Sequence, residues 1–423
     1  MIPQIKQRIE QIRRGEVPEG YKNTKGGIVP DEWVEDNLGR YLSEYKKLSN
    51  DIEKYPVYSS SRQGLIPQSK YYDNREAVET CVGYKIVPTG YVTYRHMSDD
   101  DIFHFNVNRT GGKILVSSEY PVFTVSDKGE LGYIIPMLND TARFRYFCRT
   151  QKLGGTRTRL YYKNLCAYRT AFPTYPEQKK IADILSAQDK LIELQQKKID
   201  ELKRLKKVYL SKMFPQKGCN VPEIRFPGFT DVWEQRKFSD LYEKVSRKND
   251  LTYGKDDVIS VANMYYKADS YITDESYLLT YNVFELGDIA FEGNKSKNFA
   301  HGRFVENTIG NGIVSHVFDV FKPIMPKYDL MFWKYAINNE RLMGGILLRS
   351  TKASTMMTNL VASDFLQEHF LVPRFEEQKK IGDFFARLDN LITLHRRKLD
   401  EEQKKKKSLM QLLLTGIVRV EVK

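Results

Sequence analysis

The chain has 423 residues, of which 41% are hydrophobic and 29% are charged, and its formal net charge is +13. This length suffices for two or three domains, and the apolar content excludes a disordered tail protein. No segment approaches the roughly eighteen uninterrupted apolar residues of a membrane span, and the charged N-terminus lacks an apolar signal-peptide region, so we expect a cytoplasmic protein with no membrane partner. The excess of Lys and Arg indicates a polyanionic partner.

Motifs of nucleic-acid enzymes are absent from the sequence. There is no phosphate-binding G-x-x-x-x-G-K-[ST], no G-x-G-x-x-G, and no H-x-x-x-H or H-E-x-x-H spacing among the six histidines. The four cysteines form no C-x-x-C pair, so neither a disulfide framework nor a zinc site is indicated. We therefore predict no catalytic residue, no metal ligand and no enzymatic activity.

A phrase near the middle of the chain recurs 200 residues later. The stretch "PEQKKIADIL" begins at Pro176, and "EEQKKIGDFF" begins at Glu376. Alignment of 173–214 with 373–414 gives 16 identities in 42 positions, and Trp33 matches Trp233 at the same offset. The chain is therefore a tandem repeat of one unit.

Each repeated phrase predicts the start of a long helix. Pro176 suits a first helical turn, Thr174 and Glu177 have capping-box spacing, and strong helix formers follow. Apolar residues recur at coiled-coil spacing from Ile181 to Met213 and in the same register in the second copy, although Gln, His, Lys and Glu interrupt both seams. The segments 173–216 and 371–423 also hold nine of the thirteen net positive charges.

The remaining regions are rich in Tyr, Val, Ile and Phe and are broken by turn signals, which indicates short strands with a few helices. We therefore predict an α+β protein with two similar mixed α/β domains, separated by two long antiparallel coiled-coil helices and related by pseudo-two-fold symmetry. The predicted boundaries are 1–172 for the first domain with its N-terminal lead-in, 173–216 for the central helix, 217–370 for the second domain and 371–423 for the C-terminal helix.

This layout resembles the specificity subunit of type I restriction-modification systems. Besides the two helix starts, "VPEGYKNTKGGIVPDEW" at 17–33, "GLIPQSKYY" at 64–72 and "SLMQLLLTGIVRV" at 408–420 are similar to phrases of that family. The resemblance implies two target-recognition domains, each recognising one half of a bipartite double-stranded DNA site, with the paired helices setting the spacer. It also implies two modification (methyltransferase) subunits that carry S-adenosylmethionine, separate motor-nuclease restriction subunits, and no cofactor on this chain.

Candidate DNA contacts are polar clusters that combine phosphate donors with forked side chains able to bind base edges. The strongest clusters are "GGTRTR" at 154–159 and "RSTKAST" at 349–355, which we expect to be equivalent loops. The candidate residues are Ser60, Ser61, Arg62, Gln63, Tyr94, Arg95, Thr156, Arg157 and Arg159 in the first domain, and Asn263, Tyr265, Lys267, Lys295, Lys297, Arg349, Ser350, Lys352 and Thr355 in the second. We expect the double substitution Arg157→Ala with Arg159→Ala to weaken DNA binding and its salt dependence.

Two other classes of protein fit parts of the sequence. A coiled-coil scaffold or assembly protein with two globular heads and no DNA role would show the same repeat, and an unrecognised nuclease or DNA-modifying enzyme would act without these partners. The sequence does not specify the recognised bases, the spacer length, which residues contact bases rather than phosphates, the source organism, or whether the complex restricts, only modifies or serves a related phage-defence system.

Overall fold

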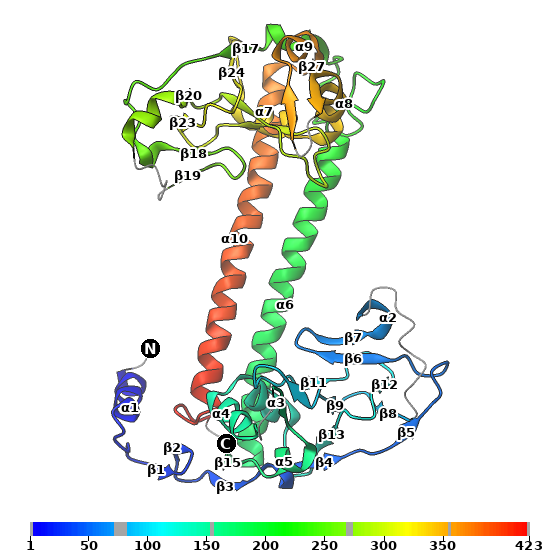
Figure 1. The fold of residues 1–423 in the computed structure, drawn as a ribbon, viewed down its shortest axis with the longest axis vertical. Helices are drawn as coiled ribbons and strands as arrows, with labels where there is room; N and C mark the ends of the chain where they lie inside the picture. Colours follow the sequence, from blue (N-terminus) through cyan, green and yellow to red (C-terminus); the bar gives the residue numbers. More distant parts are fainter. Residues whose placement is uncertain (1–2, 72–82, 153–155, 268–273, 354–356, 421–423) are drawn as a thin grey trace. The chain divides into compact units, whose positions relative to one another are not determined.

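The computed structural model describes residues 3–71, 83–152, 156–267, 274–353 and 357–420 (Figure 1). The backbone divides into a first unit, Met1–Leu194 with Lys398–Lys423, and a second unit, Gln195–Arg397. Helices α6 (Tyr175–Lys212) and α10 (Phe375–Leu413) each contribute one part to each unit. None of the described helices is both long and apolar enough to cross a membrane.

The first unit contains a four-stranded antiparallel sheet of order β11-β9-β13-β4, a three-stranded sheet of order β12-β8-β5, and two-stranded pairs. Its strands are β1 (Tyr21–Thr24), β2 (Gly27–Pro30), β3 (Val34–Asn37), β4 (Leu42–Glu44), β5 (Leu48–Ser49), β6 (Tyr58–Ser61), β7 (Gly64–Pro67), β8 (Tyr84–Val87), β9 (Val92–Thr93), β10 (Met97–Ser98), β11 (Asn106–Val107), β12 (Ile114–Val116), β13 (Val122–Val125), β14 (Thr158–Arg159) and β15 (Arg169–Phe172). Its shorter helices are α1 (Pro3–Arg13), α2 (Gln68–Tyr71), α3 (Leu131–Asp140), α4 (Ala142–Thr150) and α5 (Tyr162–Cys166).

The second unit contains a four-stranded antiparallel sheet of order β17-β24-β21-β22 and four two-stranded pairs. Its strands are β16 (Glu234–Lys237), β17 (Tyr242–Val245), β18 (Ile259–Ser260), β19 (Tyr265–Tyr266), β20 (Asn282–Phe284), β21 (Ile289–Glu292), β22 (Arg303–Glu306), β23 (Gly312–Val314), β24 (Val320–Pro323), β25 (Thr351–Ala353), β26 (Thr358–Leu360) and β27 (His369–Val372). Its shorter helices are α7 (Leu330–Ile337), α8 (Glu340–Ser350) and α9 (Ala362–Gln367).

The repeat in the sequence is a repeat in the pairing of strands. Val34 of β3 pairs with Phe172 of β15, and 200 residues later Glu234 of β16 pairs with Val372 of β27. Two fully buried asparagines are also equivalent. Asn108 Nδ2 donates to the carbonyls of residues 87 and 112 (both 2.8 Å), and Asn307 Nδ2 donates to those of residues 284 and 310 (2.9 and 2.7 Å). Both units therefore share one fold despite their divergent sequences.

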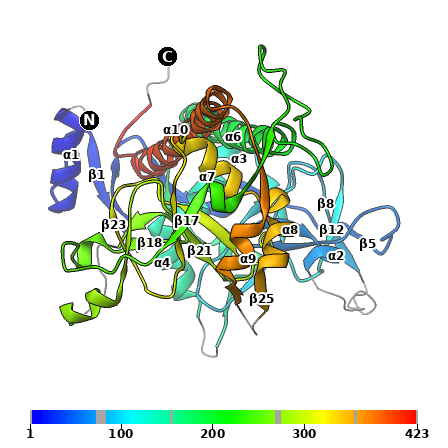
Figure 2. The same ribbon diagram turned by 90° about the horizontal axis from the view of Figure 1, so that it is seen from above.

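Aromatic side chains dominate the core of each unit. In the first unit the rings of Tyr41 and Phe172 stack with centroids 3.9 Å apart. In the second unit Trp333 of α7 packs edge-on against Tyr242 of β17, and Phe332 packs against Phe214. Figure 2 shows α7 between α10 and strands β17 and β21 of this unit. Burial of these large rings attaches each sheet to its part of the long helices.

The predicted seam is confirmed within each unit. The interrupting polar residues form antiparallel partners: Gln188 Nε2 donates to the Glu402 carbonyl (3.1 Å) in the first unit, and His395 Nδ1 lies 2.8 Å from Gln195 Oε1 in the second. Gln188 is buried, Gln195 and His395 are partly buried, and each forms a hydrogen bond across the seam, so these pairs fix the register of the two helices.

The packing of α10 against α7 explains a glycine in the second copy. Gly382 takes the place of Ala182, and a Cβ atom added there would lie 2.3 Å from Asp329 Oδ1 and 2.7 Å from the Phe332 amide nitrogen. Asp329 Oδ1 accepts a hydrogen bond from that amide and so caps α7. Only glycine permits this close approach of α10 to the start of α7.

The Glu-Gln pair of the repeated phrase is buried, which differs from the predicted capping box. Glu177 is fully buried and accepts two hydrogen bonds from Arg419, at 2.6 and 3.0 Å, and one from the Trp33 indole at 3.3 Å. In the second unit Arg225 donates to Glu377 at 2.6 and 2.8 Å. Each glutamate therefore attaches a segment that is distant in sequence to the start of its helix. A buried carboxylate is stabilised more by a paired arginine than by the backbone amide of a helix N-cap.

Candidate nucleic-acid interface

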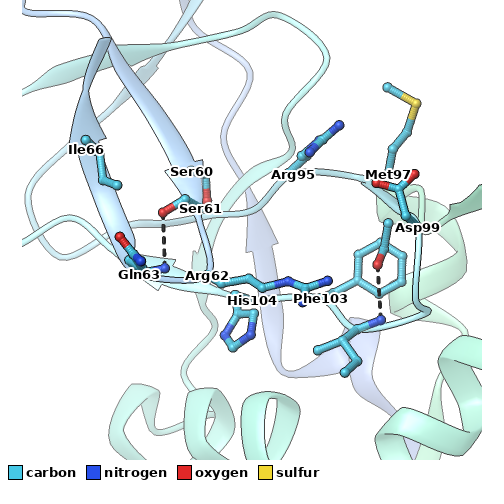
Figure 3. Close-up of a pocket in the computed structure, with 12 residues that line it drawn as sticks. Ser60, Ser61, Arg62, Gln63, Ile66, Arg95, Met97, Asp99, Phe103 and His104 are labelled. Atoms are coloured by element: carbon cyan, nitrogen blue, oxygen red, sulfur yellow. Dashed lines mark hydrogen bonds between the residues drawn. The ribbon is translucent and has the colours of Figure 1, made fainter. Parts of the chain in front are cut away.

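A polar cavity of about 350 Å³ lies in the first unit between the β6–β7 hairpin and the segment 95–104. In Figure 3, Ser60, Ser61, Gln63 and Ile66 come from the hairpin, and the segment bearing Arg95, Met97 and Asp99 lies opposite it. The remaining lining residues are Arg62, Ser98, Ile102, Phe103 and His104. Five of the nine first-domain candidates, which are Ser60, Ser61, Arg62, Gln63 and Arg95, therefore line one cavity.

Hydrogen bonds hold the hairpin in place beneath this cavity. Asn106 Nδ2 donates to Ser60 Oγ (2.8 Å) and to the Ser61 carbonyl (2.9 Å). Ser60 is buried and its hydroxyl donates to the Thr93 carbonyl (3.4 Å). The Ser60 hydroxyl is therefore used in hydrogen bonds within the protein. Gln63 and Arg95, by contrast, are exposed, and neither side chain forms a hydrogen bond or an ion pair with another described residue.

Three consecutive aspartates hold residues 157 and 158 of the cluster "GGTRTR" at the same place. Asp99 Oδ1 accepts from Arg157 Nε at 2.8 Å, Asp100 accepts from Arg62, and Asp101 accepts from the Thr158 hydroxyl. Strand β14 also pairs with β10, so Arg159 lies opposite Met97. The hairpin, the segment 95–104 and residues 156–159 therefore form one surface, referred to below as the β6–β14 surface.

The electrostatics of this surface follow from its contacts. Burial opposes ionisation of Asp100, but hydrogen bonds from Ser98 and Arg62 prevail and hold its pKa below the ordinary value. Burial lowers the pKa of His104, which lines the cavity, and that of His96, which lies just behind it. Both imidazoles are therefore neutral near pH 7, and the cavity presents donors and acceptors together rather than positive charge alone.

The prediction for Tyr94 is wrong. This residue is fully buried, packs against Phe105 and donates its hydroxyl to the Leu160 carbonyl at 3.0 Å. Successive side chains of the extended chain point to opposite sides, so Tyr94 and His96 point inward while Arg95 points outward. Tyr94 therefore supports the outward-facing residues from within the core, and its side chain has no exposed surface that could contact DNA.

The second-domain candidates also lie on neighbouring segments of one unit. Asn263, Tyr265 and Lys267 belong to the exposed β18–β19 turn and its flank, and Lys295 and Lys297 are exposed after β21. Arg303 connects the two, since its Nε donates to Glu292 (2.7 Å) and its Nη2 to the Ala262 carbonyl (2.8 Å). The β25–β26 hairpin bears Lys352 and joins the same region, because the Thr358 amide donates to the Gly293 carbonyl at 2.8 Å.

The cluster "RSTKAST" differs in part from its prediction. Ser350 ends α8, is fully buried and donates to the Ile346 carbonyl one turn earlier, so its hydroxyl cannot contact DNA. Arg349 is exposed and donates to both oxygens of Glu368. By position in the repeat, β26 is the counterpart of β14, so the segment before Thr358, rather than Arg349, corresponds to "GGTRTR". Thr355, like Gly154 and Gly155 of the first cluster, lies outside the described residues. Thr156 is exposed beside Arg157.

The second unit also contains a buried carboxyl group with a raised pKa, that of Glu306. Glu306 is 2% exposed, accepts a hydrogen bond from the Tyr328 hydroxyl, and has its pKa raised by burial. Its neighbour Tyr328 packs on Tyr242 and Trp333 in the core. Glu306 therefore belongs to the core of the unit, and no group of three metal-ligating side chains occurs among the described residues.

Sequence reasoning missed the supporting residues of both surfaces. Asp99, Asp100 and Asp101 hold the arginines and Thr158 of the β6–β14 surface, and Arg303 with Glu292 connects the segments of the second unit. Three consecutive acidic residues within a basic first domain were the available signal. An acidic run is usually a solvated loop, however, and its partners lie 38 to 58 residues away in sequence.

Known proteins are similar to this chain over most of its length. The family model of the type I restriction modification DNA specificity domain matches residues 39–204 and 230–402. Two Methanocaldococcus jannaschii proteins, the type I restriction enzyme MjaVIII specificity subunit and the putative MjaX specificity subunit, are 23% and 25% identical to this chain. Each alignment covers 95% of this chain, and 96% and 97% of the respective relative.

Solved structures are similar over most of the chain as well. The HsdS subunit from Thermoanaerobacter tengcongensis has 12% identity and a TM-score of 0.45, with 92% of this chain and 98% of that one covered. The S subunit from M. genitalium has 13% identity and a TM-score of 0.48, with 92% and 97% covered. With two matched specificity domains that together span most of its length, the chain belongs to the family of type I restriction-modification specificity subunits.

Proposed function

We propose that the first and second units each present a target-recognition domain that recognises one half of a bipartite double-stranded DNA sequence. The observation that carries this proposal is the β6–β14 surface, where candidate residues from three separate segments (60–63, Arg95 and 156–159) lie together. Forked donors such as Arg95 and Gln63 are exposed there without partners among the described residues, as base recognition in a groove requires. The second unit supplies a comparable set on its β18–β19 turn and the segment after β21.

The long helices are proposed to set the spacer between the half-sites. Half-sites must be held at a fixed distance and rotation, which a rigid helix provides and a flexible linker does not. The polar pairs of the seam support this role, because they allow one register only: Gln188 with Glu402 in the first unit and Gln195 with His395 in the second.

Exposed leucines on the helices support docking of two modification subunits. Leu191 and Leu194 are 44% and 60% exposed in the first unit, and Leu391 and Leu394 are 42% and 46% exposed in the second. The same apolar residue at the same place in both copies, outside the seam, fits a partner that binds once to each copy. We expect Leu194→Glu with Leu191→Glu to remove one modification subunit from the purified complex, and Leu394→Glu with Leu391→Glu to remove the other.

Catalysis is assigned to the partners. The modification subunits would supply S-adenosylmethionine and the methyl transfer, motor-nuclease restriction subunits would cut, and this chain would carry neither cofactor nor catalytic residue. Two assays test this assignment: methyl transfer to DNA by the complex, and the same assay with this chain alone. Methyl transfer by the chain alone would contradict it.

A domain exchange tests the two-domain model directly. Residues 30–170 are replaced by those of a related specificity subunit, and the methylome of a host carrying the complex is sequenced. One half of the methylated sequence should change while the other half and the spacer stay the same. A change in both halves would refute the model. A coiled-coil scaffold without a DNA role would give no sequence preference in a gel shift with the modification subunits present.

A further inference from the structure

The aspartates of the β6–β14 surface raise a physical question, because a carboxylate facing DNA is repelled by the phosphates. Asp100 stabilises its own loop, and Asp101 connects that loop to β14. Asp100 Oδ1 accepts from Ser98 Oγ at 2.8 Å, and Asp101, at a φ of 62°, accepts from the Thr158 hydroxyl. Asp99 accepts no hydrogen bond from its own loop among the described residues. Its only hydrogen bond there is the one from Arg157 Nε.

The geometry of that hydrogen bond suits recognition of a base. Arg157 donates through Nε, and neither of its two terminal nitrogens forms a hydrogen bond within the part of the chain that the structure describes. Two parallel donors on a guanidinium held from behind are the arrangement that binds O6 and N7 of guanine in the major groove. An exposed ion pair of this kind contributes little to stability, since Arg157 and Asp99 are 51% and 66% exposed. What the ion pair contributes is a fixed orientation of the Arg157 guanidinium.

The charge balance argues against a phosphate contact for the same arginine. A guanidinium paired with a carboxylate has no net charge, so it releases few counterions from the DNA backbone. Arg159, two residues further on, is exposed and has no ion pair with a described residue. The two arginines of "GGTRTR" are therefore chemically distinct although they point the same way.

We propose that Arg157 recognises a guanine in the half-site of the first target-recognition domain, and that Asp99 is the positioning residue that holds its guanidinium for this contact. This inference rests on the proposed function and deepens it. Arg159 then contacts a phosphate and contributes affinity without discrimination between bases.

The test uses the full chain purified with its modification subunits and a set of duplexes in which each base pair of that half-site is changed in turn. Arg157→Ala should abolish discrimination at one G·C pair, a loss of about 5- to 140-fold, with little change in the salt dependence of binding. Asp99→Asn should reduce discrimination at the same pair, and Asp99→Glu should restore part of it. The matched control Arg159→Ala should weaken binding to all duplexes alike and reduce the salt slope by about one.

The opposite pattern would overturn the inference. If Arg157→Ala weakens binding to every duplex equally and lowers the salt slope, Arg157 contacts a phosphate. If Asp99→Asn leaves discrimination unchanged while Arg157→Ala abolishes it, Asp99 is not a positioning residue. Failure of the proposed function is distinguishable, because the unsubstituted complex would then show no preference for any duplex of the set.

Discussion

Replacement of Arg419 by alanine should destabilise the first unit through a carboxylate on a different segment. Glu177 is fully buried, and without Arg419 the one hydrogen bond left to its carboxylate among the described residues is the 3.3 Å contact from the Trp33 indole. Removal of one partner of a buried ion pair costs roughly 3–5 kcal/mol. Arg419 is 31% exposed, so water can reach part of the vacated space, and we expect a loss of about 3 kcal/mol at the lower end of that range.

Arg225→Ala is the matched perturbation in the second unit. Arg225 is 12% exposed and Glu377 is 1% exposed, and no second donor to that carboxylate occurs among the described residues, so we expect a loss of about 4–5 kcal/mol. Urea unfolding monitored by hydrogen exchange and mass spectrometry assigns each loss of unfolding free energy to its unit. A loss below about 1 kcal/mol for either variant, or equal destabilisation of both units by one variant, would refute the reasoning.

Three further experiments test other features. Gly382→Ala should destabilise the second unit by about 1–3 kcal/mol in urea unfolding, whereas Gly345→Ala, on an open helix face, should stabilise it slightly; equal effects would contradict the close approach. Glu306→Gln should gain stability over the parent as pH rises above about 4.5, by at most about 1.4 kcal/mol per pH unit. The folded carboxyl keeps its proton after the unfolded one loses it, so parental stability falls through that window, and a difference independent of pH would refute this. Asn108→Ala and Asn307→Ala should each cost about 1–3 kcal/mol in thermal or urea unfolding of their own units; a cost in only one would show that the two asparagines are not equivalent.

The sequence predicted the parts of the fold that depend on periodicity. Helices α6 and α10 and the seam from Ile181 to Met213 follow from a spacing that extends over about nine helical turns and occurs twice. The strands of both units are only two to four residues long, so their alternation is too brief to specify register or partners. The presence of the β6–β7 hairpin and residues 156–159 on one surface could therefore not be deduced.

The outcome for single candidate residues depended on which side of their element they face. Arg95 faces outward and Tyr94 inward although they are adjacent, and Ser350 turns its hydroxyl to the preceding turn of its own helix. Residue type alone could identify polar clusters, but it could not separate a hydroxyl that contacts DNA from one that satisfies a buried carbonyl. The role of Glu177 escaped prediction for a related reason, since its partner arginine lies 242 residues away.

The arginine partners of the two buried glutamates have a consequence for synthesis on the ribosome. Arg225 is translated before Glu377, so the positive partner of that glutamate is already present when Glu377 is synthesised. The ion pair of Glu177 cannot form until Arg419 has been translated. The core of the first unit also includes Leu413 and Leu414. The half of the protein that is translated first is therefore the half that completes its folding last, and until then it exposes an apolar surface that only the end of the chain can cover.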